Sequence, residues 1–163
     1  MALDVKIKTN AKHLEKRYAR LKSKFPNIID KGLLQAGFQL LDIIRTKTKK
    51  GIDFNDKRFA AYSRGYIKRL EREGKPTKVD LFYSGRMLSA LTPSAKTVKR
   101  TGKHKITLGF SNAEMRTRAL FNQVMMGDKN REFFGFNTRT ENIIKKQFNR
   151  FVQKEFRKMR IWV

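Results

Sequence analysis

The side chains that could bind a metal are few in this sequence and far apart. The two histidines, His13 and His104, have no acidic or imidazole neighbour at the spacing that metal ligands need, so we interpret them as exposed histidines in basic segments. Asp53, Asp56 and Asp80 are of the type that nucleases gather around Mg²⁺. Because lysines and arginines lie close to each acidic residue, surface ion pairing is the simpler interpretation. A metal-dependent nuclease is the least favoured function.

The sequence also offers few residues for nucleophilic catalysis. The chain has no cysteine, which also removes disulfides and leaves the redox compartment open. It contains no Gly-x-Ser-x-Gly motif, no phosphate-binding Gly-x-x-x-x-Gly-Lys-Ser/Thr motif and no Gly-x-Gly-x-x-Gly motif. The sequence therefore predicts a protein that is not an enzyme and that needs no cofactor or metal.

Positive charge is the main physical signal. Lysine and arginine number 39 against 14 acidic residues, a formal net charge of +25. Self-repulsion at this charge favours an anionic partner. Nucleic acid and an acidic protein surface remain equal alternatives, and no motif for sequence-specific reading is present. The contact candidates are Lys12, Lys16, Arg17 and Arg20 near the N-terminus, and Lys145, Lys146, Arg150, Lys154 and Arg157 near the C-terminus.

Length and composition predict a single domain over residues 1–163. The hydrophobic share of 39% and the 13 phenylalanines are sufficient for a core. No apolar run reaches the length of a transmembrane span, and the first residues lack the apolar core of a signal peptide. We therefore expect an intracellular product without a membrane partner.

The first third of the chain predicts a strand and two helices. Alternation of apolar and polar residues over 3–9 is typical of a half-buried strand. Apolar spacing predicts helices over 11–25 and 27–47, with Pro26 ending the first. Gly37, on the apolar face of the second helix, would allow another element to approach closely.

The rest of the chain alternates short helices with a hairpin. We expect short helices over 63–73 and 81–91, and a hairpin of strands 94–100 and 103–110 joined near Thr101-Gly102. Two further helices, 112–126 and a long C-terminal helix over 141–159, complete an α+β fold with a small antiparallel sheet packed against several helices. The expected caps are Asn112 and either Thr138 or Thr140, and the expected buried residues of helix 112–126 are Ala119, Leu120 and Val124.

Residues 51–76 form a polar, basic stretch with isolated aromatic residues, which predicts a long loop. Phe54, Phe59, Tyr62 and Tyr66 either anchor this loop to its own core or contact another subunit. A similar aromatic cluster at 133–136 favours a packed corner before the last helix over an exposed contact patch. An assembly loop over 51–76 is therefore one of two open interpretations.

A series of short motifs follows residue 51. In chain order they are Gly51-Ile52-Asp53-Phe54, then Phe59, Tyr62, Ser63 and Tyr66, then Ser84-Gly85-Arg86-Met87-Leu88, the strand 106–110, Phe121-Asn122-Gln123, and finally Arg131, Phe133, Phe134, Gly135 and Phe136. In this order they resemble the motifs of the tailed-bacteriophage virion morphogenesis family, also called tail completion or head–tail joining proteins. Glu132 stands where that family usually has proline.

The resemblance implies a structural virion protein of the phage neck, made in the host cytoplasm. Such subunits form homo-oligomeric rings, with six- or twelve-fold symmetry expected, between the portal or connector and the tail terminator or tail tube. Non-specific contact with genomic double-stranded DNA is also implied. Gly85 would permit a tight backbone approach, and Arg86 would make a charge-assisted hydrogen bond. The implied subunit-contact or motif residues are Phe54, Phe59, Tyr62, Ser63, Tyr66, Gly85, Arg86, Met87, Phe133, Phe134 and Gly135.

An alternative comes from the charge alone. A non-specific basic nucleic-acid-binding protein, such as a packaging accessory factor, would show the same composition without belonging to a ring.

Overall fold

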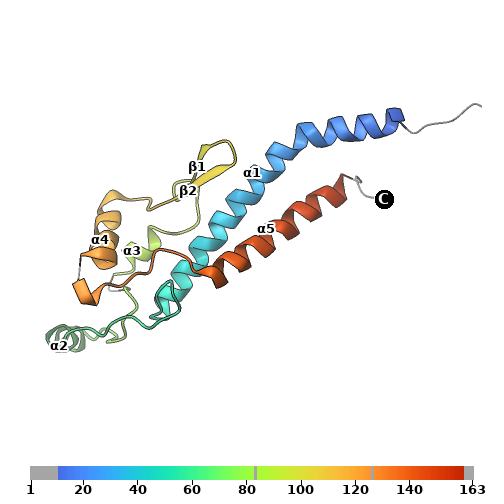
Figure 1. Cartoon of the computed structure of the whole chain (residues 1–163). Coiled ribbons are helices and arrows are strands. Elements are labelled where there is room, and N and C mark those ends of the chain that lie inside the picture. Colours follow the sequence, from blue (N-terminus) through green and yellow to red (C-terminus); the bar gives the residue numbers. More distant parts are fainter. Residues whose placement is uncertain (1–10, 83, 126, 160–163) are drawn as a thin grey trace, which may run out of the picture.

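The computed structural model describes residues 11–82, 84–125 and 127–159, so the strand expected over 3–9 lies outside the described residues. The fold is α+β: most of its elements are helices, and they accompany a small antiparallel sheet (Figure 1). None of the helices that the structure describes combines the length and apolarity that crossing a bilayer needs. In chain order the elements are α1 (Ala11–Lys49), α2 (Arg64–Arg72), α3 (Arg86–Ser89), β1 (Val98–Gly102), β2 (Lys105–Leu108), α4 (Ala113–Val124), the 3₁₀ helix η1 (Gly127–Lys129) and α5 (Thr138–Lys158).

The prediction that Pro26 ends the first helix is wrong. α1 is one helix of 39 residues with Pro26 inside it, and it bends along its length (Figure 1). An internal proline removes one backbone hydrogen bond and costs about 3 kcal/mol. Packing against α5 on both sides of Pro26 offsets this cost. Phe25 stacks on Phe156 of α5 with ring centroids 5.9 Å apart, and Gly32 lies directly against Phe148.

α5 runs alongside the middle of α1 (Figure 1). Aromatic side chains of α5 make the contact, because Phe148 and Phe151 lie where a side chain at Gly32 would otherwise stand. The cap differs from the prediction. Asn137 caps α5 by accepting a hydrogen bond from the Thr140 N–H at 2.9 Å, and Thr140 itself is buried.

The hairpin of β1 and β2 packs on α1 at Gly37, as that glycine predicted. A Cβ at Gly37 would lie 2.7 Å from Val98 Cγ1 and 2.8 Å from Ile106 Cδ1. The turn is not at Thr101-Gly102: Gly102 pairs with Lys105, and His104 carries the positive φ of 52°. His104 is half-buried rather than exposed, because its Nδ1 contacts the buried carboxylate of Asp30 on α1 at 3.1 Å; Arg100 pairs with the same carboxylate.

The core lies at the C-terminal end of α1, where α3, α4 and the hairpin meet it (Figure 1). On α4, Asn112 is the predicted cap and Ala119 is buried as expected. Leu120 and Val124 are not buried: 52% and 56% of their surfaces are exposed, because Met115 and Ala119 face the core instead. The buried core residues are Leu41, Ile44, Phe59, Met87, Leu88, Ala90, Leu91, Val98, Met115, Ala119 and Phe133.

Two short helices flank this core. The predicted helix 63–73 is α2, capped by Ser63 through the Tyr66 N–H. The predicted helix 81–91 is shorter than expected and reduces to α3. Leu81 and Gly85 have positive φ values of 54° and 70°, and this backbone cannot continue a right-handed helix.

Candidate functional site

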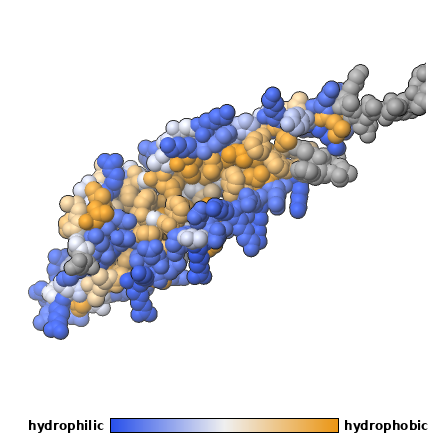
Figure 2. All heavy atoms as spheres, in the orientation of Figure 1, coloured by the Kyte–Doolittle hydropathy of each residue, from blue (hydrophilic) through white to orange (hydrophobic). Residues whose placement is uncertain are grey.

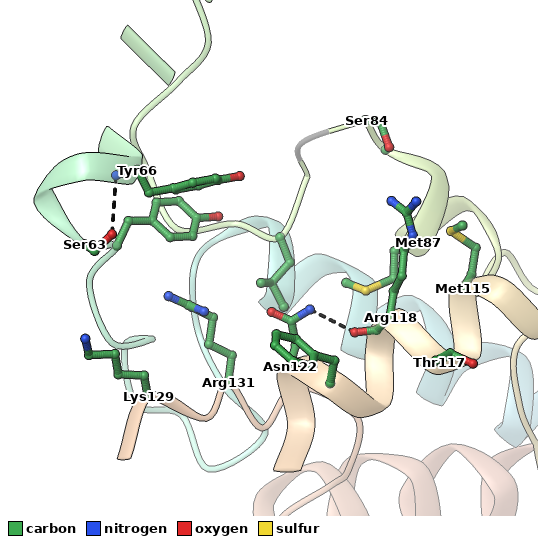
Figure 3. Close-up of a pocket in the computed structure, with 14 residues that line it drawn as sticks. Ser63, Tyr66, Ser84, Met87, Met115, Thr117, Arg118, Asn122, Lys129 and Arg131 are labelled. Carbon is green, nitrogen blue, oxygen red and sulfur yellow. Dashed lines mark hydrogen bonds between the residues drawn. The ribbon is translucent and has the colours of Figure 1, made fainter. Parts of the chain in front are cut away.

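A cavity of about 780 Å³ lies between α2, the segment before α3, and α4 (Figure 3). Figure 3 shows side chains from all three facing the same hollow. Leu81, Met87, Met115 and Phe121 give it apolar walls, and Arg118 and Lys129 add positive charge. Five of the predicted contact residues line it: Tyr62, Ser63, Tyr66, Gly85 and Met87.

Two tyrosines and an arginine form one wall of this cavity. The rings of Tyr62 and Tyr66 meet edge to face with centroids 4.7 Å apart. The guanidinium carbon of the buried Arg131 lies 4.9 Å from the Tyr62 centroid, within range of a cation–π contact. Burial, with a smaller contribution from Tyr66, raises the pKa of Tyr62 above its ordinary value of 10.0. The Tyr62 phenol therefore stays neutral at physiological pH.

The last motif is fixed to α4 by Gln123. Its Oε1 accepts hydrogen bonds from the backbone N–H groups of Phe133 and Phe134, both at 3.1 Å, and its Nε2 donates to the Phe134 carbonyl at 3.2 Å. These bonds hold Phe133 in the core at 1% exposure. The corner at 133–134 is therefore packed, as predicted, whereas Phe136 is 54% exposed.

Phe54 packs on the backbone of Gly135. A Cβ at Gly135 would lie 3.0 Å from Phe54 Cγ, so the ring uses the space that glycine leaves. Phe59 is a core residue, at 9% exposure. Of the loop aromatics, Phe54 and Phe59 thus anchor the loop to its own fold, while Tyr62 and Tyr66 face the cavity.

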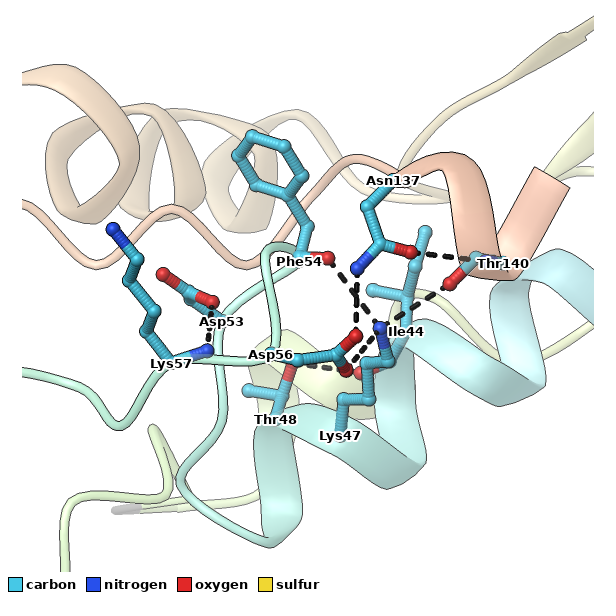
Figure 4. A network of polar contacts seen from close by, with 9 residues as sticks. All are labelled: Ile44, Lys47, Thr48, Asp53, Phe54, Asp56, Lys57, Asn137 and Thr140. Carbon is cyan, nitrogen blue, oxygen red and sulfur yellow. Dashed lines mark hydrogen bonds and ion pairs between the residues drawn. The ribbon is translucent and has the colours of Figure 1, made fainter.

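A polar network joins the end of α1, the 51–76 loop and the start of α5 (Figure 4). The Lys47 ammonium lies at its centre, 2.8 Å from Asp56 Oδ1, and donates to Thr140 Oγ1 at 3.2 Å and to the Phe54 carbonyl at 3.4 Å. Asn137 donates to Asp56 Oδ2 at 2.7 Å. The Lys47 and Asn137 hydrogen bonds lower the pKa of Asp56 below its ordinary 3.8.

The aspartates considered for a nuclease are used in local structure. Asp53 Oδ1 accepts the Lys57 N–H at 2.7 Å, and Asp80 Oδ1 accepts the Phe82 N–H at 2.9 Å. Over residues 11–82, 84–125 and 127–159, no three histidine or acidic side chains gather as a metal ion would require.

Gly85 and Arg86 differ from the roles implied for them. A Cβ at Gly85 would lie 2.9 Å from the Phe82 ring, so the close approach is made by a side chain and not by backbone. Arg86 is exposed, and its guanidinium makes no hydrogen bond or ion pair with any residue of the described ranges. The expected charge-assisted hydrogen bond is therefore not found among the described residues.

An exposed apolar surface on α4 was missed by sequence reasoning. We call Leu120, Phe121, Val124 and Met125 the α4 patch; each is more than half exposed, from 51% to 62%. These positions share one face of the helix, opposite Met115 and Ala119. Phe121 also lines the cavity, so the α4 patch and the cavity form one continuous apolar surface. Contiguous apolar surface of this kind is typical of protein contacts.

The predicted basic residues lie along α1 and α5. Figure 2 shows blue side chains bordering the orange apolar band of these helices. Lys16, Arg20 and all five residues of the α5 set are exposed, and Arg17 is half-buried. Lys145 pairs with Glu141 at 2.7 Å. In the part of the chain that the structure describes, no such pair involves Lys16, Arg17, Arg20, Lys146, Arg150, Lys154 or Arg157; Lys12 is in α1, with its side chain outside the description.

Comparisons with known proteins add no relative: no family model, curated protein or solved structure matches this chain.

Proposed function

We propose that this chain is a structural virion protein of a tailed phage, a ring-forming neck subunit that joins the DNA-filled head to the tail. Its role is to bind copies of itself and neighbouring neck proteins by shape and charge. The observation that carries the proposal is the convergence of the sequence motifs around one cavity.

The motif residues are distant in sequence and adjacent in the fold. Tyr62 and Tyr66 come from the motif that begins at Phe59, Gly85 and Met87 from the motif over 84–88, and Arg131 from the last motif. All five line the cavity. Gln123 then ties the last two motifs together through the backbone of Phe133. Motifs that build one structural unit support the resemblance more strongly than short sequence matches do.

The α4 patch supports an assembly role. A closed ring needs two different surfaces on each subunit, because a head-to-tail contact joins unlike faces. The cavity with the α4 patch supplies one such apolar surface, at the end of the molecule where α2, α3 and α4 gather (Figure 1). The exposed Leu14 and Tyr18 near the start of α1, at 59% and 71%, supply a second one far from it.

The charge supports acidic neighbours in such an assembly. Arg118, Lys129 and the exposed Arg86 lie around the cavity or beside it, so the apolar surface has a positive rim. A rim of one sign favours a partner of the opposite sign and disfavours wrong partners. The portal side or the tail side of the neck would then present acidic groups to this subunit.

Location in the particle tests the proposal. Purified virions should contain this chain, and cross-linking with mass spectrometry should join its lysines to portal or tail proteins and to other copies of itself. Native mass spectrometry of the purified chain should show a closed oligomer, alone or with a neck partner. Absence from virions, with the protein abundant in infected cells, would contradict a neck role and favour a packaging accessory.

A further inference from the structure

We propose that the cleft between α1 and α5 binds the phosphate backbone of double-stranded DNA. The cleft has a volume of about 380 Å³ and is lined by Arg20, Lys24 and Lys31 of α1 and by Lys158 of α5. This site differs from the cavity beside α4, and its duplex affinity is measured without any assumption about a neck. The duplex is the packaged genome if the proposed location holds.

The two helices bring their cations to one place. Glu155 is the one carboxylate among the lining residues that the structure describes, and it pairs with Lys158. Its pKa is lowered by the Lys158 hydrogen bond and, more weakly, by the charges of Lys31 and Lys154, so side chains from both helices act on the same point. Four cations facing one carboxylate repel one another, and an added anion relieves that repulsion.

The row of cations continues along α1 beyond the cleft. Arg17, Arg20, Lys24 and Lys31 follow at steps of three, four and seven residues, which keeps them on one helical face. The row spans about 21 Å at 1.5 Å per residue. That length corresponds to about six base pairs at 3.4 Å each, so several phosphates of one strand fall within its reach.

Phosphate fits this face better than an acidic protein does. Protein interfaces are centred on buried aromatic or aliphatic anchors. Among its described lining residues the cleft offers none that is exposed, because Ile28 is 7% exposed and Met159 is half-buried. The exposed Tyr18 lies on the α1 face that carries Leu14 instead. A face of charge without apolar anchors is what non-specific backbone binding requires.

Double-stranded DNA fits the cleft better than single-stranded DNA does. Proteins that hold single strands stack bases on aromatic side chains beside a basic groove. Among the residues that the structure describes, the lining of the cleft contains no aromatic residue: besides its charged side chains, it comprises Asn27, Ile28 and Met159. The cleft is therefore suited to contacts between its positive charges and the regular phosphate backbone of duplex DNA.

A neutralising pair of variants tests the site. The probe is a labelled 25-base-pair duplex of arbitrary sequence, titrated with the full chain by fluorescence anisotropy at 50 to 200 mM NaCl. In Lys24→Gln/Lys31→Gln we expect binding at 100 mM salt to weaken by more than about tenfold, and the slope of log K against log salt to fall by about 2, since each phosphate contact contributes about 0.9. Lys99→Gln/Lys103→Gln, with the same net charge but on the hairpin, is the control and should lose less than about threefold.

Other outcomes overturn the proposal. Equal losses in the two double variants would mean that net charge binds the duplex without a cleft site. An equal or higher affinity for the single strand, or displacement of the duplex by polyglutamate of equal total charge, would assign the cleft to another partner. No binding of the unaltered chain at 50 mM salt would also reject it. All four substituted lysines are exposed, so we expect the helices to persist in each variant. Circular dichroism of each variant checks this.

Discussion

The side chain of Gln123 holds the backbone of Phe133 from a position ten residues away. The Phe133 N–H donates to Gln123 Oε1 at 3.1 Å, and the same oxygen accepts from Phe134. One amide on α4 thereby aligns the chain segment that enters the core through Phe133 and leaves it through Gly135.

Loss of this amide should destabilise the fold. Gln123→Ala leaves the two backbone N–H groups and the Phe134 carbonyl without their partner, and we expect a loss of about 2–3 kcal/mol in the free energy of unfolding. Urea denaturation followed by circular dichroism measures it. Gln153→Ala, at an exposed position of α5, is the control and should change stability by less than about 0.5 kcal/mol. An effect of equal size in both variants would contradict a special role for Gln123.

Gly51 should not tolerate a side chain. Its φ is +77°, and a Cβ there would lie 2.7 Å from the Val79 carbonyl oxygen, a backbone atom that cannot rotate away. We expect Gly51→Ala to cost about 2–3 kcal/mol through strain and this clash. Gly65→Ala, in α2 with no atom within 4 Å of the added methyl, should instead stabilise the protein by up to about 1 kcal/mol. Thermal denaturation should therefore show a lower melting temperature for Gly51→Ala and a higher one for Gly65→Ala than for the unaltered chain.

Asp56 should make the stability of the fold depend on pH. Its pKa is lower in the folded chain than its ordinary 3.8, because Lys47 and Asn137 hydrogen-bond to the carboxylate. A lowered pKa stabilises the folded state above pH 3.8, and this contribution is lost as the pH falls through the folded-state value. Asp56→Asn removes it, and asparagine accepts the left-handed backbone of this position, φ 68°.

The measurement compares urea midpoints of the unaltered chain and Asp56→Asn at pH 7 and pH 3. We expect the variant to be less stable at pH 7 and the difference to shrink at pH 3. Glu71→Gln removes an exposed carboxylate of α2 and should leave the stability nearly unchanged at both values. A difference between Asp56→Asn and the unaltered chain that stays constant with pH would show that the network does not depend on the ionised carboxylate.

The α4 patch should be needed for assembly and not for folding. Leu120→Gln/Val124→Gln places a good helix former at each of two exposed positions, so the melting temperature should stay within a few degrees. Incorporation into virions, measured in a complementation assay, should drop at least tenfold. Ile143→Gln, at a 41% exposed position of α5, is the control and should assemble normally. Normal assembly of the α4 variant would show that this face is not a subunit contact.

Much of the local structure follows from sequence patterns. Asn112 and Ser63 were recognisable caps or helix starts because short polar side chains satisfy free N–H groups. The close approach at Gly37 followed from a glycine on an apolar helical face. The long C-terminal helix was predictable because its apolar residues repeat with the 3.6-residue period of an amphipathic helix.

Features that depend on distant partners were not predictable. Pro26 stays helical because α5 packs on both sides of it, and that contact joins residues more than a hundred positions apart. On α4, Met115 with Ala119 and Leu120 with Val124 form two apolar faces of similar period, and only the packing shows which one meets the core. The cleft between α1 and α5 was not predictable, because the sequence does not show that these two helices are neighbours.

The length of α1 has a consequence for how copies of this chain would be connected. At about 58 Å for 39 residues, the helix is longer than the core that it supports, and its first turns extend past the last turn of α5 (Figure 1). A subunit with such an overhang can touch more than its immediate neighbour in a circle. Interlacing of this kind would make an open arc less stable than the closed circle, so intermediates of partial size should be scarce.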